Sequence, residues 1–215
     1  MFFSKFRCPT TLRKLYPGWK GRSFTLLDVG CGNHFAQKVK LWFPQALYFG
    51  LDREVYDNDL SLMEKFFQAD LTRSDLSFLE NDFFDVIICS HVIEHLPNGL
   101  EVIDRLSSKL KKGGEIYIEF PSPKSLSLWS AEGTLNFCDD PTHVRVYDIK
   151  EIANTLLQNK VTVLRAGKAR DLLRTLLFPI SLPLQLFYLF KHGKIKVKFA
   201  LWDVTGFADY VHGKK

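Results

Sequence analysis

The sequence lacks the cysteine patterns and the leading apolar segment that would assign it to a secreted or zinc-binding class. Its four cysteines are widely spaced and form no Cys-x-x-Cys pair, so neither a disulfide framework nor a zinc site is indicated. Lys5, Arg7 and Pro9 interrupt the apolar residues at the start, so no signal-peptide core is present there. We therefore expect a reducing, cytoplasmic setting, with peripheral attachment to a membrane left open.

Charge is absent from residues 175–190, an apolar run that is nevertheless too short for a simple transmembrane helix. As a helix it spans about 24 Å, against about 30 Å for a hydrocarbon core, and Pro179 and Pro183 are expected to break it. Lysines follow at positions 191, 194, 196 and 198. Two interpretations stay open: a lid over a substrate pocket, or peripheral contact of residues 175–198 with an anionic membrane. Both favour an apolar or membrane-associated substrate.

Acidic residues are absent from the first 24 residues, which carry six Lys and Arg. Residues 25–159 carry twelve bases and twenty-one acids, and residues 160–215 carry eleven bases and three acids. Basic ends suggest an anionic partner, such as a membrane, nucleic acid or phosphorylated substrate, although a solvated basic surface is an equally simple explanation. The chain length suits one domain over residues 1–215. Residues 1–23 form a basic leading segment with a short helix that Pro17 and Gly18 should end.

Apolar runs alternate with helical patterns along most of the chain. Strands are expected at 24–29, 46–51, 66–69, 85–90, 115–120, 161–166 and 207–212. Helices are expected at 34–43, from Pro97 through Lys109, Lys111 and Lys112 to Gly113, and at 148–158, where Asp148 and Glu151 form a capping box. This alternation predicts an α/β fold with a central, mostly parallel, seven-stranded sheet and helices on both faces. Residues 121–147 read as a long irregular connection of functional importance, and residues 171–200 as an insertion between the last two strands.

A glycine turn follows the first expected strand, in Leu-Leu-Asp-Val-Gly-Cys-Gly at residues 26–32. Gly30 and Gly32 allow unusual backbone angles and the close approach of a ligand to the main chain. A helical pattern begins directly afterwards, so backbone N–H groups should face that ligand. The dinucleotide fingerprint Gly-x-Gly-x-x-Gly fails here, because its third position is Phe35.

Acidic residues mark the ends of the first three strands, at Asp28, Asp52 and Asp70. Ligands of open α/β sheets bind at the carboxyl ends of the strands. Asp52 follows Gly32 by twenty residues, a spacing that suits a carboxylate accepting both hydroxyls of a ribose. Asp70 is placed to accept from an exocyclic amine such as that of adenine. Together they predict an adenosine site, although each acid could also serve as a turn or cap residue.

The chain resembles the class I S-adenosylmethionine-dependent methyltransferases, in the small-molecule or ubiquinone-biosynthesis-like branch. The matching pieces occur in the family's order over residues 24–120: residues 26–32, Gly-Leu-Asp (50–52), Gln-Ala-Asp-Leu (68–71), Phe-Asp-Val-Ile-Ile-Cys-Ser-His-Val-Ile-Glu-His-Leu (84–96) and Leu-Lys-Lys-Gly-Gly-Glu-Ile-Tyr-Ile (110–118). Two later segments, 141–151 and 202–210, are also similar to the family. The resemblance implies a Rossmann-like methyltransferase fold and S-adenosyl-L-methionine as cofactor.

The resemblance also implies roles for residues by position. Asp28, Gly30 and Gly32 would shape the pocket for the methionine part, Asp52 would hold the ribose, and Asp70 and Leu71 would hold the adenine. Ser90 and His91 would border the methionine part and the incoming substrate.

Histidines are the candidates for acid–base chemistry. Methyl transfer depends mainly on positioning and exclusion of water, but a hydroxyl acceptor gains from a general base. The candidates are His91, His95 and His143, each of which could instead be a hydrogen-bonded structural residue. His91-x-x-Glu94-His95 matches a zinc-protease pattern, but it is expected to straddle a strand end and a loop rather than lie in a helix. No metal is expected.

The sequence thus predicts an enzyme that methylates a small or lipid-linked acceptor, with oxygen as the expected acceptor atom. An RNA methyltransferase is the first alternative. The Asn/Asp-Pro-Pro-Tyr/Phe pattern of common base-amino methyltransferases is replaced by Ser-His-Val-Ile at 90–93, which makes a nucleic-acid partner unlikely. The second alternative is a non-catalytic S-adenosylmethionine-binding protein.

Overall fold

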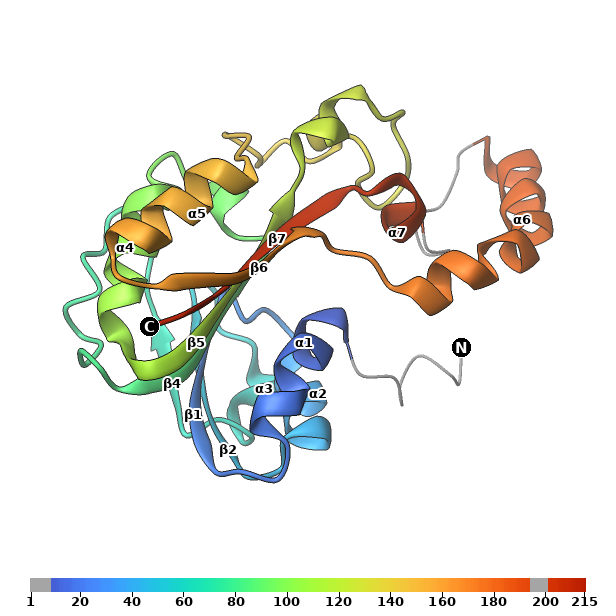
Figure 1. Ribbon diagram of the computed structural model, residues 1–215. Coiled ribbons are helices and arrows are strands. Elements are labelled where there is room, and N and C mark those ends of the chain that lie inside the picture. The colour runs from blue at the N-terminus through green and yellow to red at the C-terminus, as the bar shows by residue number, and fades with distance from the viewer. Residues whose placement is uncertain (1–8, 194–200) are drawn as a thin grey trace.

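A single twisted sheet of seven strands organises the computed structural model, which describes residues 9–193 and 201–215 (Figure 1). The strands are β1 (Phe24–Val29), β2 (Ala46–Asp52), β3 (Lys65–Gln68), β4 (Phe84–Ser90), β5 (Leu110–Pro121), β6 (Thr162–Lys168) and β7 (Ala208–Lys214). Their order across the sheet is β3-β2-β1-β4-β5-β7-β6. Strands β1 to β5 pair in parallel, and β7 runs antiparallel to both β5 and β6. The predicted mostly parallel α/β sheet is confirmed.

Helices cover both faces of the sheet because its central strands are apolar on both sides. Successive strand residues point to opposite faces, so Leu26 and Leu27 enter different cores. Leu26 packs with α1 (Thr10–Trp19) and α2 (Phe35–Trp42), near the one-turn helix α3 (Asp57–Leu60). Leu27 packs with the other layer, which contains α4 (Gly99–Lys109) and α5 (Ile149–Gln158). A sheet covered in this way exposes its ligand-binding chemistry only at the strand ends.

Two helix boundaries differ from the predictions. Pro17 lies inside α1 rather than ending it, because Leu15 and Trp19 on either side are both buried against the sheet. Helix α4 starts at Gly99 and ends at Lys109, so the glycines at 113 and 114 lie in β5 instead of closing the helix. Pairing with β4 extends β5 backwards to Leu110, and this tertiary contact overrides the local helix-end signal.

The predicted cap of α5 is confirmed. Asp148 accepts hydrogen bonds from the N–H groups of Lys150 and Glu151, and the Glu151 side chain accepts from the N–H of Asp148. This reciprocal arrangement fixes the start of the helix and therefore the end of the connection that precedes it.

The connection from 121 to 147 is largely irregular, as predicted, and contains two short 3-10 helices, η3 (Pro123–Ser127) and η4 (Phe137–Asp139). A third, η2 (Ile93–His95), follows β4. Backbone N–H groups of Val144 and Arg145 donate to the carbonyl of Glu94, which ties the end of the connection to η2. The connection therefore lies over the end of β4.

Between β6 and β7 the chain forms α6 (Leu172–His192) and α7 (Leu201–Thr205). The prediction that Pro179 and Pro183 break the apolar run is wrong, because both lie inside one continuous helix. Each proline removes one backbone donor, and Figure 1 shows α6 changing direction along its length, as proline-containing helices do. Within the described part of the chain, no helix is both long and apolar enough to cross a membrane. The beginning of the basic leading segment and the lysines at 194, 196 and 198 lie outside the described residues.

Candidate active site

The glycine turn after β1 has the geometry that its sequence requires. Gly30 and Gly32 both adopt left-handed backbone angles, with φ of 67° and 51°. A Cβ atom on Gly30 would lie 2.3 Å from Cγ2 of Val92, so no larger residue fits at this position. The N–H of Gly30 donates to the carbonyl of Leu51 at 2.7 Å, which draws the turn toward the end of β2.

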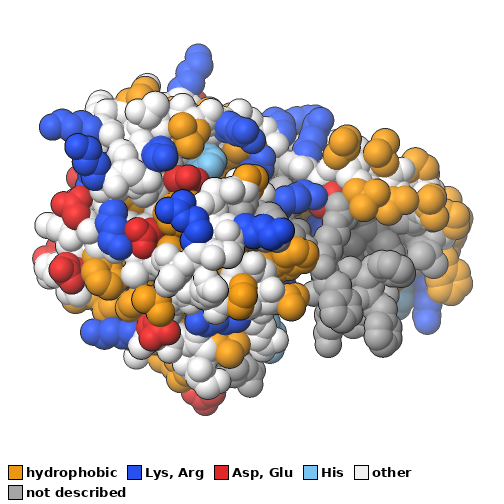
Figure 2. All heavy atoms as spheres, turned by 60° about the horizontal axis from the view of Figure 1, so that its bottom comes forward, with side chains coloured by type: hydrophobic (Ala, Val, Ile, Leu, Met, Phe, Trp, Pro, Cys, Tyr) orange, Lys and Arg blue, Asp and Glu red, His pale blue; other side chains and the backbone are white. Residues whose placement is uncertain are grey.

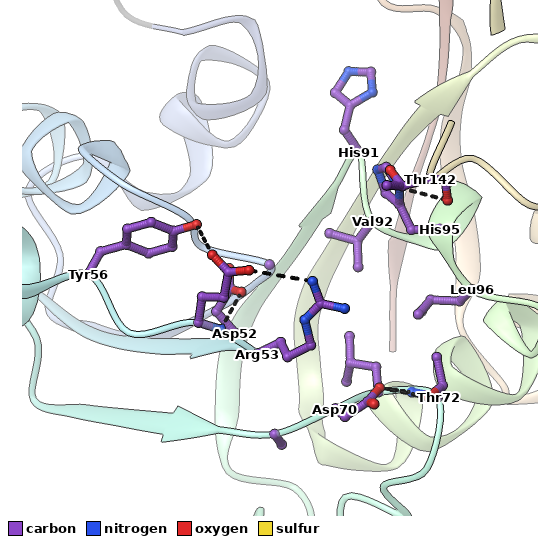
Figure 3. A pocket seen from close by; sticks show the side chains of 14 residues that line it. Asp52, Arg53, Tyr56, Asp70, Thr72, His91, Val92, His95, Leu96 and Thr142 are labelled. Carbon is purple, nitrogen blue, oxygen red and sulfur yellow. Dashed lines mark hydrogen bonds and ion pairs between the residues drawn. The ribbon is translucent and has the colours of Figure 1, made fainter. Parts of the chain in front are cut away.

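Asp52 lies where β2 ends and is linked directly to the glycine turn (Figure 3). Its Oδ2 accepts from the N–H of Gly32 at 2.9 Å, and its Oδ1 accepts from the N–H of Glu54 at 3.1 Å. Each carboxylate oxygen has two lone pairs, so both can still accept a hydroxyl of a ligand. The carboxylate is therefore held by the backbone and keeps capacity for a diol.

Asp70 follows β3, two residues beyond the last strand residue. Its Oδ1 accepts from both the hydroxyl and the N–H of Thr72, at 2.7 and 2.9 Å. These two hydrogen bonds hold the pKa of Asp70 below its usual value, so the group is an ionised acceptor at neutral pH.

A cavity of about 420 Å³ connects these groups at the carboxyl ends of β1, β2, β3 and β4. Of the predicted site residues, it is lined by Gly30, Asp52, Asp70, Leu71, His91 and His95. Arg53, Tyr56, Thr72, Val92 and Leu96 also line it, and Figure 3 shows them around the same space. Three predicted cofactor residues, Asp28, Gly32 and Ser90, are not among the described residues of this lining.

Asp28 lies behind the cavity and is buried, with 4% of its surface exposed. The hydroxyl of Tyr48 in β2 donates to its Oδ2 at 2.6 Å. Burial raises the pKa of Asp28 to about 7, although the Tyr48 hydrogen bond opposes this shift. The geometry gives Asp28 a supporting position between β1 and β2, one layer below the groups that face the cavity.

His91 directly follows β4 with a left-handed φ of 56°, and its N–H donates to the carbonyl of Glu119. Its ring lies between two carboxylates: Nδ1 is 3.1 Å from Oε1 of Glu94, and Nε2 is 3.4 Å from Oε1 of Glu119. Burial lowers the pKa of the ring, but the two carboxylates outweigh it and raise the pKa to about 10. His91 is therefore an imidazolium at neutral pH and suits the role of donor better than that of proton acceptor.

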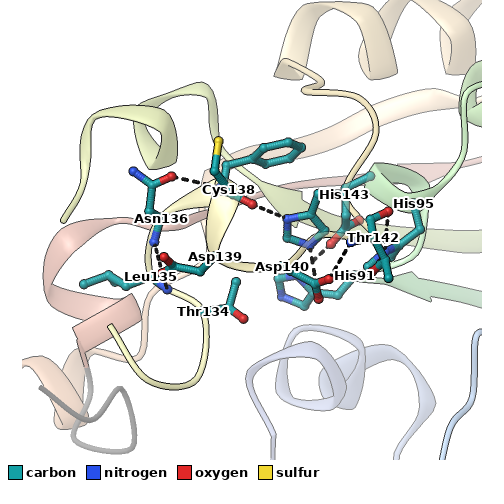
Figure 4. Close-up of polar contacts among 12 residues, drawn as sticks. His91, His95, Thr134, Leu135, Asn136, Cys138, Asp139, Asp140, Thr142 and His143 are labelled. Carbon is teal, nitrogen blue, oxygen red and sulfur yellow. Dashed lines mark hydrogen bonds and ion pairs between the residues drawn. The ribbon is translucent and has the colours of Figure 1, made fainter. Parts of the chain in front are cut away.

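His95 and His143 are held by other contacts (Figure 4). Nδ1 of His143 lies 2.7 Å from the carbonyl of Phe137, which can only accept, so Nδ1 donates, and Nε2 lies 3.9 Å from Oδ2 of Asp140. The Thr142 hydroxyl donates to Asp140, so its oxygen is left to accept from Nδ1 of His95 at 2.9 Å. The ring centroids of the two histidines are 4.8 Å apart. Both rings are therefore fixed through Nδ1.

A second cavity of about 220 Å³ lies beside the first and shares His91 and His95 with it. Its other lining residues are Glu94, Gly133, Thr134, Asp140, His143, Trp202 and Phe207. The structure therefore brings the three predicted catalytic histidines to one place, although they come from the residue after β4, from η2 and from the 121–147 connection. Whether any of them transfers a proton stays a prediction.

Glu94 adds a feature that the sequence analysis did not use. It is 1% exposed, and its Oε2 has no hydrogen-bond partner among the described residues. Ligand atoms of Glu94, His95 and His143 lie within 4.8 Å of one another, close enough to hold a metal ion. The prediction that no metal is needed stays a prediction.

Sequence reasoning also missed Glu119 and Thr142. An available signal was that Glu119 comes near the end of the fifth strand, as Asp52 does at the end of the second. No local pattern marks Thr142, because its contact with His95 joins positions 47 residues apart.

Comparison with known proteins decides the family. A family model described as a methyltransferase domain matches residues 6–164, about three quarters of the chain. The chain belongs to the class I S-adenosylmethionine-dependent methyltransferases. This confirms the family predicted from the motifs, and with it S-adenosyl-L-methionine as the cofactor. The cavity residues fit such a ligand, because the carboxylates of Asp52 and Asp70 face a space at the ends of adjacent strands.

The methyltransferase is similar to curated and solved proteins of the same fold. Trans-aconitate 2-methyltransferase of Rhizobium rhizogenes is 32% identical over 98 residues, which cover 44% of this chain and 38% of that protein. The aligned part thus spans well under half the length of this relative. A methyltransferase from Archaeoglobus fulgidus superposes with a TM-score of 0.60 at 21% identity, covering 100% of this chain and 98% of the other. Burkholderia thailandensis 1,6-didemethyltoxoflavin-N1-methyltransferase gives 0.58 at 12% identity, covering 98% and 77%. These two structures confirm the Rossmann-like fold.

Proposed function

We propose that this methyltransferase transfers the methyl group of S-adenosylmethionine to an oxygen atom of a small or lipid-like acceptor. The observation that carries the proposal is the pair of adjoining cavities that share His91 and His95. The larger cavity has the carboxylates that suit adenosine, and the smaller has the histidines. A reaction between two bound molecules needs two such sites with a common wall.

On the donor side, each residue has a role that follows from its position. Asp52 would accept the ribose hydroxyls, and Asp70 with Leu71 would hold the adenine. Gly30 and Gly32 would leave room for the methionine part. Asp28 and Ser90, which lie outside the described lining, would act by supporting this wall.

On the acceptor side, the chain supplies orientation and a proton acceptor. S-adenosylmethionine, when bound, supplies a methyl group that is already activated for transfer. The His91 ring, held between Glu94 and Glu119, would fix the wall beside the acceptor oxygen. Nε2 of His143 or His95 would take the proton of a hydroxyl acceptor. Trp202 and Phe207, whose rings stack at 4.6 Å, would exclude water from this end of the cavity.

The acceptor class rests on two supports. Cationic His91 beside the rings of His95 and His143 suits an acidic hydroxyl or a carboxylate oxygen. The name of the Rhizobium rhizogenes relative also specifies a small carboxylic acid as its substrate. A lipid-like acceptor is supported by the exposed apolar surface of α6, described below.

Calorimetry with S-adenosylmethionine tests the donor half. The unmodified protein should bind the cofactor, the Asp52→Ala variant should bind it much more weakly, and Glu64→Ala, an exposed acid outside the cavity, should match the unmodified protein. Failure of the unmodified protein to bind would contradict the donor site.

Release of S-adenosylhomocysteine tests the acceptor half, with a panel of carboxylic acids, phenols and long-chain hydroxy compounds. At least one oxygen acceptor should be turned over, and His143→Gln should slow that turnover by about a hundredfold or more while leaving cofactor affinity unchanged. Turnover of amines alone would contradict oxygen transfer. A salt-dependent gel shift with RNA would favour the nucleic-acid alternative. Cofactor binding without turnover of any compound would favour a non-catalytic binding protein.

A further inference from the structure

Helix α6 presents apolar side chains to solvent along its whole length. Between 42% and 87% of the surface is exposed in Leu172, Leu173, Leu176, Leu177, Ile180, Leu182, Leu186, Phe187 and Phe190. Figure 2 shows hydrophobic side chains gathered on the part of the molecule that α6 forms. Exposed apolar groups on this scale mark an interaction site in soluble proteins.

The five most exposed of these residues form a stripe along one face of α6. Leu172, Leu176, Ile180, Phe187 and Phe190 follow spacings of four, four, seven and three residues, which place them on one helix face. The opposite face is the attached one. It carries Phe178, which packs against the core beneath α7, and Leu189, which lines a cavity. The stripe therefore remains free while the helix is anchored.

The charges around the stripe have one sign. From residue 172 to residue 200 the sequence contains no Asp or Glu and five Lys or Arg, at positions 174, 191, 194, 196 and 198. A helix with an apolar face and flanking cations suits the interface of an anionic bilayer, where the apolar side enters the acyl region and lysines meet lipid phosphates. A protein partner that bound the stripe in an apolar groove would not require residues 172–200 to lack Asp and Glu.

The attached face of α6 borders a cavity that adjoins the cavity of the histidines. A cavity of about 540 Å³ is lined by residues 130–134 and by Leu189 and Gly193 at the end of α6. Tyr188 donates from its hydroxyl to Glu132 at 2.8 Å, which joins the helix to this loop. The cavity shares Gly133 and Thr134 with the smaller cavity that contains His91 and His143.

We propose that α6 docks this protein on an anionic lipid bilayer, with its Leu172–Phe190 stripe in the acyl boundary and the exposed cations Arg174 and Lys191 on the headgroups. Docking in this way holds the 130–134 cavity, on the attached face of α6, about one helix diameter (about 10 Å) from the bilayer, so an acceptor at the membrane surface has a short distance to His91. This second statement rests on the proposed function, whereas the docking itself needs no catalysis.

Flotation of the full chain with vesicles tests the docking. Vesicles of phosphatidylcholine mixed with phosphatidylglycerol should carry the protein upward, and pure phosphatidylcholine vesicles should carry much less. The triple variant Leu176→Glu, Ile180→Glu, Phe187→Glu should lower the bound fraction on anionic vesicles by at least about tenfold. The matched control places glutamates at Leu41 and Leu157, which are also exposed but lie on α2 and α5, and it should float like the unmodified protein.

Three further measurements make the result decisive. Cofactor affinity of the triple variant should equal that of the unmodified protein, which separates loss of docking from loss of the donor site. Amide hydrogen exchange in α6 should slow when anionic vesicles are added. Unchanged flotation of the triple variant would overturn the proposal, as would equal binding to neutral vesicles. So would light scattering that shows a dimer of the unmodified protein and a monomer of the triple variant, because a second copy would then cover the stripe.

Discussion

The cavity proposed for the methyl donor and the cavity proposed for the acceptor are built in different ways, although they share a wall. The donor cavity is formed mainly by the ends of β1 to β4 and the residues that follow them, with Thr142 contributed by the 121–147 connection, and backbone N–H groups hold its two acids in place. The acceptor cavity draws on η2, the 121–147 connection and α7, which are far apart in the sequence. A sheet that is buried on both faces fixes most of the first, whereas the second depends on how long connections pack. We therefore expect the donor site to follow the family and the acceptor choice to be particular to this chain.

The largest expected effect is on the donor side, at Gly30. Replacement by alanine puts a Cβ 2.3 Å from Cγ2 of Val92 in a left-handed conformation, so Gly30→Ala should lower the free energy of unfolding by about 2–4 kcal/mol. Thermal or denaturant unfolding measures this loss. Gly32→Ala is the matched control, because φ is also positive at Gly32 but no atom lies within 4 Å of the Cβ position. Its cost should be about 1 kcal/mol, and equal losses in the two variants would contradict the steric argument.

The next largest effect is on cofactor affinity, and it distinguishes Asp52 from Asp70. Asp52→Asn removes the charge from a carboxylate that the backbone holds toward the cavity, and it should weaken cofactor binding by about ten- to a hundredfold. Asp70→Asn should cost less, because the hydrogen bonds that hold its carboxylate are exposed to water, whereas the bond from Gly32 to Asp52 is half-buried. Calorimetry on both variants gives the ranking. A greater loss of cofactor affinity in Asp70→Asn would show that the adenine contact contributes more to binding than the ribose contact does.

His91, in the wall between the cavities, should make stability depend on pH. Its folded-state pKa is raised from 6.5 to about 10, so its ion pairs stabilise the fold fully below pH 6.5 and are lost as the pH rises toward 10. The unmodified protein should therefore lose more stability over this range than His91→Gln does. Melting temperatures across the range measure the difference. Parallel curves would show that His91 is not charged between Glu94 and Glu119.

The smallest expected effect concerns metal on the acceptor side. Dialysis against a chelator should leave cofactor affinity, melting temperature and turnover unchanged, because the predicted reaction needs no metal. The test is informative because the ligand atoms of Glu94, His95 and His143 lie close enough together to hold a metal ion. If a chelator lowered turnover and a divalent cation restored it, this cluster would be a metal site rather than a proton acceptor.

Most of the sheet could be predicted from the sequence because buried strands and their polar ends leave local signals. The expected strand 24–29 matches β1, and Asp52 and Asp70 lie at the rim where the pattern placed them. Errors occurred where a tertiary contact competes with a local signal. Pairing with β4 drew residues 110–114 into β5, and two prolines failed to interrupt α6.

By itself, the sequence determined the order of strands and helices, the glycine turn and the acids that define the donor site, because each depends on neighbours along the chain. Only the tertiary structure decided the surroundings of the histidines. His91 is cationic because Glu94 and Glu119 approach it from η2 and β5, while Thr142 and Phe137 hold Nδ1 of His95 and of His143. The exposed stripe of α6 was likewise decided by packing, since an apolar run in a sequence does not reveal which of its faces stays uncovered.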